Sequence, residues 1–251
     1  MTADADADIL FPNLRVRAGD VPERILVVGD PARAALVAER LDDMHEISRN
    51  REYVMFGGTH RGEAIGVISH GVGSPGAAVC FEELCRGGAR RLVRAGTTGG
   101  LQPDVVDGDL VIARAAVRDE GLTSKIVPLA YPAVASLEVI LSLRAGAMRR
   151  GVRMTEGIVL TSDVFYPYPV LSNDLAMWAR AGVVAVEMEC SALFVVAAMH
   201  GVETGAILTV DGNPLAEHTG DMSDYDPHRP IVDAAVDAMV DIALDTVAMP
   251  L

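Results

Sequence analysis

Residues 24 to 31 read Arg-Ile-Leu-Val-Val-Gly-Asp-Pro, and this stretch indicates the fold of the chain. The aliphatic residues 25–28 are typical of a short buried strand, and the glycine after them suits a tight turn. Asp30 and Pro31 then mark a helix start, because proline is tolerated in the first turn, where its missing N–H is not needed. The sequence therefore predicts a strand, a turn and a helix that runs to about Leu41.

The same alternation of strands and helices continues along the chain. Further strands are predicted at residues 52–57, 64–69, 91–96, 109–113, 155–161, 183–187 and 205–210, and further helices at residues 76–86, 133–150, 189–200 and 229–247. No repeat, low-complexity tract or linker interrupts the pattern. We therefore expect one α/β domain with a twisted, mostly parallel central sheet, preceded by a disordered acidic lead-in at residues 1–8.

Composition narrows the class of protein. The chain has 251 residues, of which 50% are hydrophobic, and none of its apolar runs approaches the roughly 20 residues that span a bilayer. Its formal net charge of −14 should repel nucleic acid. The chain starts with acidic residues, whereas a signal peptide starts with basic ones. We therefore expect a cytoplasmic protein with neither nucleic-acid nor membrane partners.

Cysteine, histidine and lysine usage carry further information. Cys80, Cys85 and Cys190 show no Cys-x-x-Cys spacing and lie in apolar surroundings, so we interpret them as reduced core thiols. The histidines show no metal-ligand spacing, and we expect no metal site. Lys125 is the only lysine, so nearly all cations are arginines, whose planar guanidinium suits phosphate and carboxylate recognition.

Three predicted strands end in residues that could bind a ligand, and ligands of parallel sheets collect at the carboxyl ends of strands. Gly29 and Arg33 follow the first strand and could hold an anion, although an ordinary turn with a surface arginine is the simpler explanation. Arg94 lies within an apolar strand, where its burial requires an anionic partner, and Thr97 follows it. Asp211 either caps a turn or acts as a general acid with a raised pKa.

A fourth strand, residues 183–187, ends in Glu187, Met188 and Glu189. Buried carboxylates are costly unless they are paired or hydrogen-bonded, so this pattern favours a ligand with hydroxyls or positive charge. The competing interpretation is that one glutamate is only an acid in the first turn of the next helix.

Two further patterns in the stretch Gly71-Val-Gly73-Ser-Pro-Gly76 are misleading. It fits the dinucleotide fingerprint, but no acid lies about 20 residues further on to bind a ribose, so NAD binding is disfavoured. Ser74 does not lie in a Gly-x-Ser-x-Gly motif and has no matching aspartate and histidine, so we discount a serine hydrolase.

Taken together, these segments resemble the nucleoside phosphorylase family, of the hexameric purine nucleoside and uridine phosphorylase type. The resemblance covers nearly the whole chain in order. It depends on Val28-Gly-Asp-Pro31 with Arg33, Asn50-Arg-Glu-Tyr53, Ser69-His-Gly-Val-Gly-Ser74, Arg94-Ala-Gly-Thr97, Ser162-Asp-Val-Phe-Tyr166, Val186-Glu-Met-Glu189 and Val210-Asp-Gly212. It implies a single-domain, three-layer phosphorylase-type α/β fold over residues 9–251, with a twisted mixed, mostly parallel central sheet flanked by helices.

The resemblance also implies a role for each matching residue. Phosphate would be held by Gly29, Arg33, Arg94 and Thr97, with Arg51 reaching in from a neighbouring subunit. The nucleoside would be bound by Val72, Phe165, Glu187, Met188 and Glu189, of which Glu189 accepts from the ribose 2′- and 3′-hydroxyls. Asp211 falls where the family's purine enzymes carry their catalytic acid.

The activity implied is phosphorolysis of a purine ribonucleoside, with a 6-oxopurine base, to free base and ribose 1-phosphate. Cleaving the ribosyl C–N bond develops positive charge on the sugar and negative charge on the base, which calls for an anionic nucleophile and a proton donor. Inorganic phosphate would be the co-substrate, and no cofactor is expected. A shared site implies a homo-oligomer built from dimers, and the family type suggests a hexamer.

The sequence departs from the family pattern at two places. Asn13 occupies the position of a histidine that usually reaches the nucleoside 5′-hydroxyl across the interface. Residues 167–172 lack the glutamine and arginine with which uridine phosphorylases grip uracil, so a uridine phosphorylase is the second interpretation. A hydrolytic nucleosidase would not need the three arginines. A nucleoside- or phosphate-binding protein without catalysis is the alternative from another class, because a fold does not guarantee an activity.

Overall fold

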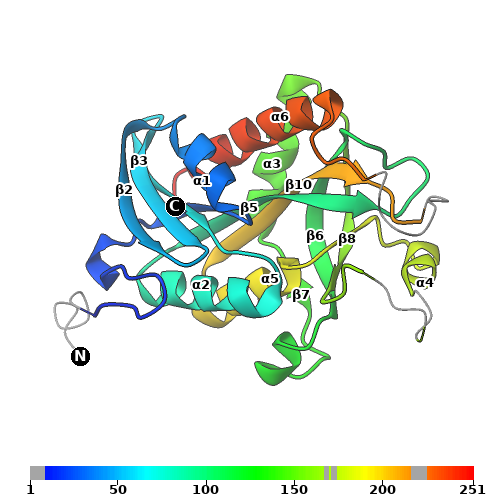
Figure 1. Ribbon diagram of the computed structural model, residues 1–251, viewed down its shortest axis with the longest axis horizontal. Coiled ribbons are helices and arrows are strands. Elements are labelled where there is room, and N and C mark those ends of the chain that lie inside the picture. Colours follow the sequence, from blue (N-terminus) through cyan, green and yellow to red (C-terminus); the bar gives the residue numbers. More distant parts are fainter. Residues whose placement is uncertain (1–8, 167–169, 171–173, 216–224) are drawn as a thin grey trace.

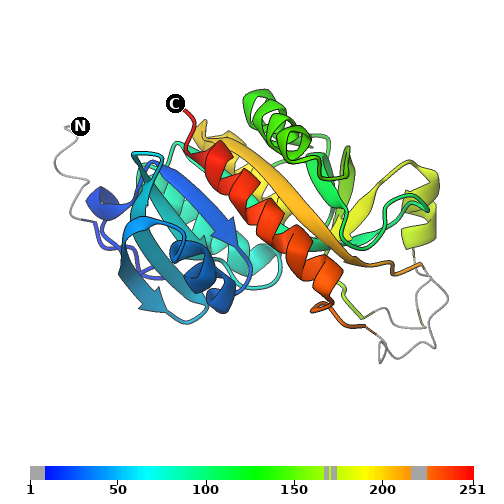
Figure 2. The ribbon, with the colours of Figure 1, turned by 90° about the horizontal axis from the view of Figure 1, so that it is seen from above.

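A twisted sheet runs through the molecule and carries helices on both of its faces (Figure 1 and Figure 2). The structure is a computed structural model, and it describes residues 9–166, 170, 174–215 and 225–251. The expected lead-in at residues 1–8 lies outside these residues. Within the described part of the chain, no helix has the length and apolar character needed to cross a membrane.

Ten strands form the sheet within the described residues. They are β1 (Arg24–Val28), β2 (Asp42–Asn50), β3 (Tyr53–His60), β4 (Glu63–Ser69), β5 (Arg91–Gly100), β6 (Leu110–Asp119), β7 (Ala133–Val134), β8 (Met154–Ser162), β9 (Ala185–Glu187) and β10 (Glu203–Gly212). The helices are α1 (Pro31–Ala38), α2 (Ser74–Arg86), α3 (Leu137–Arg150), α4 (Leu175–Arg180), α5 (Cys190–His200) and α6 (Pro230–Val247), with short 3₁₀ turns at Ala18–Asp20 and Thr123–Lys125.

The predicted strand, turn and helix at the start are confirmed, and Asp30 caps α1 by accepting a hydrogen bond from the N–H of Ala32 at 2.9 Å. Three features of the local structure differ from the prediction. β2 was missed because it is an edge strand whose residues 42–46 are all exposed, which leaves no apolar alternation to detect. The predicted helix 133–150 begins only at Leu137, since Ala133–Val134 pair with β6, and the short helix α4 was not predicted.

The expected mixed α/β sheet in three layers is confirmed, with a smaller parallel share than expected. Among the described strands, β1 pairs with β4 and β5, β5 with β10, and β8 with β6 and β9 in parallel, while five other pairings are antiparallel. β5 also pairs with both β9 and β10, so the strands β5, β10, β6, β8 and β9 close into a ring. The sheet is therefore open at its β2 edge and barrel-like at the other end.

Two apolar clusters fill the space between the sheet and its helices. α1, α3 and α6 pack on one face, and α2 and α5 pack on the other (Figure 1). Residues 190–197 of α5 are all buried, which explains why this helix is apolar on every side. The core thus holds the sheet from both faces, and the sites for polar side chains are left at the strand ends.

One edge of β5 is left unpaired in its middle. β1 pairs with β5 only as far as Arg94, and β9 pairs on the same edge only at Gly99 and Gly100. β1 and β9 run in opposite directions, so both carboxyl ends point into the interval of residues 95–98. This interval is the point at which the sheet changes its order, and it is where α/β sheets bind ligands.

Candidate active site

The unpaired interval of β5 brings together side chains from distant parts of the chain. Glu187 comes from the end of β9, and Gly29 follows the end of β1. Asp211 ends β10, which pairs with β5 on its other edge through Thr209 and Thr97. Three of the predicted strand ends therefore meet at one place.

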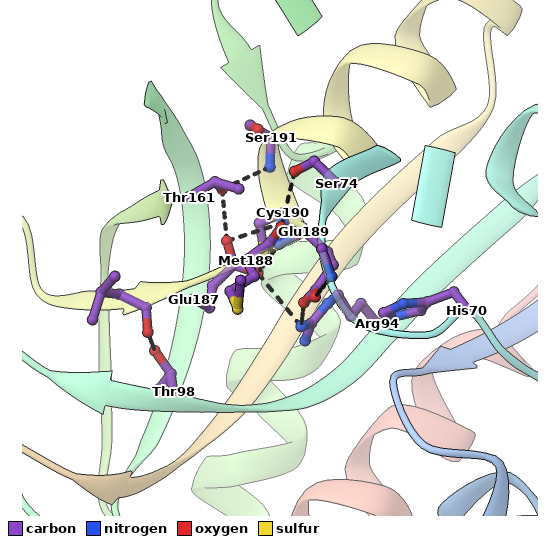
Figure 3. Close-up of polar contacts among 12 residues, drawn as sticks. His70, Ser74, Arg94, Thr98, Thr161, Glu187, Met188, Glu189, Cys190 and Ser191 are labelled. Atoms are coloured by element: carbon purple, nitrogen blue, oxygen red, sulfur yellow. Dashed lines mark hydrogen bonds and ion pairs between the residues drawn. The ribbon is translucent and has the colours of Figure 1, made fainter. Parts of the chain in front are cut away.

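Arg94 lies at the centre of this place, fully surrounded by protein. One of its terminal nitrogens, Nη2, donates a short hydrogen bond to Glu189 Oε2 and lies 3.5 Å from Glu187 Oε2 (Figure 3). The side chain folds back over its own strand, and a Cβ at residue 96 would overlap the guanidinium, so Gly96 is required there. Burial lowers the pKa of Arg94, but the charges of Glu189 and Glu187 outweigh burial and hold the pKa above its ordinary value. Burial of Arg94 was predicted to require an anionic partner, and Glu189 and Glu187 are such partners.

Glu187 and Glu189 differ in how many hydrogen-bond acceptor sites remain free for a ligand. Glu187 accepts from Thr161 Oγ1 at 2.6 Å, from the N–H of Glu189 at 2.8 Å and from the N–H of Cys190 with both oxygens. A carboxylate has about four lone-pair sites, so these donors and Arg94 saturate Glu187. Glu187 therefore fixes Arg94 and the start of α5, and its predicted contact with the nucleoside stays a prediction.

Glu189 keeps acceptor capacity for a ligand. Its Oε1 accepts from the N–H of Gly73 at 2.6 Å and its Oε2 from Arg94, which leaves a lone pair on each oxygen. Burial raises its pKa, but the charge of Arg94 more than offsets burial, so the pKa lies below its ordinary value. Glu189 is thus an ionised acceptor at the N-terminus of α5. Glu189 does lie at the start of α5, as the alternative interpretation of an acid in the first helical turn expects, but its side chain turns back to Arg94.

The loop between β4 and α2 closes over Glu189. Gly71 and Gly73 have φ angles of +77° and +90°, a conformation that side chains with a Cβ rarely adopt, and this turns the N–H of Gly73 toward the carboxylate. Ser74 Oγ donates to the carbonyl of Met188 at 2.8 Å, which ties the loop to the segment between the two glutamates. Val72, between the two glycines, is 79% exposed and therefore available to a ligand at the mouth of the site.

His70 lies beside Arg94 and is completely buried (Figure 3). Its Nδ1 is 2.8 Å from the carbonyl of Gly71, and a carbonyl only accepts, so Nδ1 carries the hydrogen and Nε2 is an acceptor. Within the described residues, Nε2 of His70 and both Nε and Nη1 of Arg94 are buried without a hydrogen-bond partner. Such atoms are costly in a protein interior, and they mark a place designed for a polar molecule.

Asp211 forms a second group of polar side chains with Thr97, Arg33 and Tyr225. The hydroxyl of Tyr225 donates to Asp211 Oδ2 at 2.8 Å, and Asp211 as a residue is 5% exposed. Burial raises the pKa of Asp211, against the opposing effects of hydrogen bonds from Tyr225 and Thr97 and of the charge on Arg33. This combination fits a carboxyl that can carry a proton, as predicted for an acid.

Arg33 connects the two groups. Burial lowers its pKa, Asp30 and Asp211 raise it, and the nearby charge of Arg94 lowers it further. Two guanidiniums held close together repel each other unless an anion lies between them. The backbone of Gly29 lies beside them, with His70 Cε1 only 3.9 Å from where a Cβ of residue 29 would be.

An aromatic side chain flanks this second group. Phe165 is 48% exposed, and its ring contacts those of Tyr166 and Tyr225 edge to face, with centroids 4.9 and 6.3 Å apart. Exposed aromatic rings beside a polar cluster are suited to bind a planar base. Of the predicted residues, the structure thus brings together Gly29, Arg33, Val72, Arg94, Thr97, Phe165, Glu187, Met188, Glu189 and Asp211.

Asn13 and Arg51 are not part of this group. Asn13 donates to Glu83 of α2 through its side chain at 2.6 Å, and its carbonyl accepts from Asn50 at 2.8 Å. Arg51 is exposed in the turn between β2 and β3, and no hydrogen bond or ion pair to it occurs among the described residues. Both residues therefore lie together, next to the loop that carries Val72, because Glu52 contacts Gly71.

Sequence reasoning assigned no role to His70, Ser74, Thr161 or Tyr225. His70 and Ser74 lie inside a quoted motif, so only their contacts were missing. Tyr225 lies within the stretch 212–228, whose glycine, proline and acids carry no periodicity, and no sequence signal connects it to Asp211. For metals, the described residues contain no group of three or more histidine, cysteine, aspartate or glutamate side chains suited to hold an ion.

Comparison with known proteins identifies relatives with this architecture. The family model described as the phosphorylase superfamily matches residues 23–248. A purine nucleoside phosphorylase of Plasmodium falciparum is 36% identical over 96% of this chain and 97% of its own, and a uridine phosphorylase of Treponema pallidum is 36% identical over 83% and 84%. The crystal structure of a purine nucleoside phosphorylase from Toxoplasma gondii in complex with immucillin-H superimposes with a TM-score of 0.90, at 36% identity and 95% coverage of both chains.

We expect His70 to make the fold acid-sensitive. Burial, and after it the charge of Arg94, lower the pKa of His70 from 6.5 to about 4. As the pH falls, the unfolded chain binds this proton first, so folding loses stability from about pH 6.5 down to about pH 4. The loss should approach about 3 kcal/mol.

Urea unfolding of wild type and His70→Gln between pH 4 and 8 measures this effect. The difference in unfolding free energy between the two proteins should change over that pH window in favour of the variant. His45→Gln, at an exposed histidine, is the matched control and should follow wild type. A constant difference between wild type and His70→Gln at all pH values would show that His70 is not held neutral by the fold.

Proposed function

Because this chain belongs to the phosphorylase superfamily, we propose that it is a purine nucleoside phosphorylase, a pentosyltransferase that cleaves purine ribonucleosides with inorganic phosphate. Its products would be the free base, of the 6-oxopurine kind, and ribose 1-phosphate. The relatives include purine and uridine enzymes at equal identity, so overall similarity does not choose the base. The observation that carries our choice is Asp211, a shielded carboxyl with a raised pKa beside an exposed aromatic ring.

We assign the phosphate to the space between Arg33 and Arg94. The two guanidiniums lie close enough for the charge of one to lower the pKa of the other, in a chain with a net charge of −14. Within the described residues, Arg94 has two buried nitrogens without a hydrogen-bond partner. Gly29 follows the end of the adjoining strand β1, and Thr97 lies three residues further along β5. A dianion there would satisfy donors that are otherwise costly to bury. Inorganic phosphate is then the co-substrate, and the proposed reaction needs no other cofactor.

We assign the ribose to Glu189 and Met188. Glu189 has a free lone pair on each oxygen and is ionised, so it suits two adjacent hydroxyl donors. Glu187 is saturated by its own hydrogen bonds, and it acts by fixing Arg94 and the start of α5. We therefore assign different roles to the two carboxylates: Glu187 positions Arg94, and Glu189 binds the ribose.

We assign the base to the region of Phe165, Val72 and Asp211. As the C–N bond breaks, negative charge develops on the purine, and a proton delivered to N7 neutralises it. Asp211 is poised for this step because burial keeps its carboxyl partly protonated at a higher pH than usual. Phosphate held opposite, beneath C1′, meets the positive charge that develops on the sugar, and such positioning supplies up to about 7–11 kcal/mol at the well-oriented limit.

We further propose that the enzyme is a homo-oligomer built from dimers, with a hexamer as the expected assembly. Arg51 and Asn13 lie together, apart from the site of their own chain, which fits a contribution to a neighbour's site. Arg51 would complete the phosphate pocket there, and Asn13 would lie near the nucleoside 5′ end. The cytoplasm is the proposed location, in keeping with three buried thiols.

Base release decides the activity. We expect wild type to release hypoxanthine from inosine only when phosphate is present, and to act more slowly on adenosine and uridine. Arg33→Ala should raise the phosphate KM about tenfold or more; it is a cleaner probe than Arg94→Ala, which leaves two buried carboxylates without their cation at a cost of about 3–5 kcal/mol. Phosphate-independent release would indicate a nucleosidase, preferred release from uridine would favour a uridine phosphorylase, and no release would indicate a binding protein.

Replacing Asp211 tests the acid. Asp211→Asn should bind nucleoside with little change and lose roughly 10²–10⁴-fold in turnover of inosine, because an amide of the same shape cannot donate the acid proton. The loss should be much smaller with 7-methylguanosine, whose base leaves without protonation at N7. Equal losses on both substrates would mean that Asp211 only stabilises the neighbouring segment.

Mixed oligomers test the shared site. We expect subunits carrying Arg51→Ala, mixed with subunits carrying Asp211→Asn, to regain part of the wild-type activity, since some sites then combine an intact Asp211 with an intact Arg51. Unmixed preparations of each variant are the controls. If verified mixed oligomers stay as inactive as the separate variants, Arg51 does not serve the neighbouring site.

A further inference from the structure

Tyr225 makes a contact that the proposed reaction has not used. Its hydroxyl donates to Asp211 Oδ2 at 2.8 Å, while its ring lies over Gly212, 3.5 Å from where a Cβ of residue 212 would be. A Cβ at position 212 would lie in ordinary van der Waals contact with this ring. The ring of Tyr225 therefore packs against the backbone next to the aspartate.

The segment that carries Tyr225 is itself fixed to the same aspartate. Nη2 of Arg229 donates to the backbone carbonyl of Asp211 at 2.8 Å, Nε donates to the carbonyl of Asp226 at 2.9 Å, and Nη1 pairs with Asp107 Oδ2 at 2.5 Å. These contacts join β10, the turn before β6 and the segment before α6. The phenol is thus held next to the carboxyl both by its own hydrogen bond and by the contacts of Arg229.

We propose that Tyr225 is a positioning residue for Asp211. The hydroxyl of Tyr225 fixes the rotation of the Asp211 carboxyl and directs its acid proton to Oδ1. This inference depends on the proposed function, in which Asp211 protonates the base. A hydroxyl that donates to Oδ2 makes that oxygen the acceptor, so a protonated Asp211 carries its hydrogen on the other oxygen. A carboxyl without this partner can rotate and present either oxygen, and small misplacements of a catalytic group are costly.

The groups around Asp211 determine how removal of the Tyr225 hydroxyl should change the pKa of Asp211. Arg33 faces the carboxyl from α1, Arg229 lies on its backbone side, Thr97 donates from β5, and Tyr225 donates from the segment before α6. Burial raises the pKa of Asp211 and the Tyr225 hydrogen bond lowers it. Loss of that bond should therefore raise the pKa, and activity that requires the protonated acid should persist to higher pH.

The central experiment compares Tyr225→Phe with wild type on inosine and 7-methylguanosine across the pH range. We expect kcat for inosine to fall roughly tenfold with little change in KM, and kcat for 7-methylguanosine to change little. The alkaline limb of kcat/KM for inosine should move up by about one pH unit. Tyr166→Phe removes a hydroxyl from the same aromatic cluster and should keep the wild-type limb.

Two further variants keep the test decisive. Tyr225→Phe introduced into Asp211→Asn should cause no further loss on inosine, because the acid that Tyr225 positions is already absent. Arg229→Gln loosens the segment without altering the phenol, so it should lower inosine turnover selectively even if Tyr225→Phe folds poorly. Equal losses on both substrates, an unmoved limb, or additive losses in the double variant would each overturn the inference. Failure of Asp211→Asn alone to impair inosine turnover would instead refute the proposed acid.

Discussion

The ion pair between Arg94 and Glu189 is the interaction on which the site depends. Arg94 is the last residue of β5 that pairs with β1, and β9 joins the same edge of β5 only at Gly99, so a charged side chain can fill the space beside residues 95–98. Burying a guanidinium without anions would cost several kcal/mol, and Glu189 and Glu187 remove that cost. In turn, Arg94 keeps Glu189 ionised at the start of α5. Each group therefore requires the other in order to stay charged inside the protein.

This arrangement leaves an imbalance that a ligand can correct. The two carboxylates use one terminal nitrogen of Arg94, while its Nε and Nη1 stay buried and unpaired among the described residues. Arg33 adds a second positive charge close by, and His70 is held neutral by burial. The local excess of donors contrasts with the acidity of the chain as a whole. An anion of phosphate size is the ligand that this local excess favours, and the remaining lone pairs of Glu189 favour hydroxyls next to it.

The acid end of the site follows a different principle. Asp211 is shielded from water, and among the residues that the structure describes its near partners are the neutral hydroxyls of Tyr225 and Thr97, with no cation at hydrogen-bond distance. The pKa of Asp211 is therefore raised, whereas the pKa of Glu189, only one strand away, is lowered. The two acids thus differ in protonation because of their partners rather than their residue type. That difference is what a reaction with an anionic nucleophile and a proton donor requires.

Much of this was already determined by the sequence. The apolar run 25–28 with its glycine, aspartate and proline fixed the first strand, turn and helix, and the cost of burying Arg94 predicted that an anionic partner existed. The alternation of patterns gave the α/β class, because periodicity depends only on neighbours along the chain. The exposed edge strand β2 escaped it because it leaves no apolar pattern. The ring closure through β9 escaped it because periodicity along the chain does not say which strands pair.

Only the tertiary structure decided how the site divides its tasks. Glu187 and Glu189 look alike in sequence, but one is saturated by Thr161 and the backbone of α5 while the other faces Gly73 and Arg94. Tyr225 lies 14 residues from Asp211 along the chain, across a stretch without periodicity, and meets it only because Arg229 anchors its segment to β10. Hydrogen-bond capacity and burial are properties of assembled neighbours, so they emerge only when the strand ends have come together.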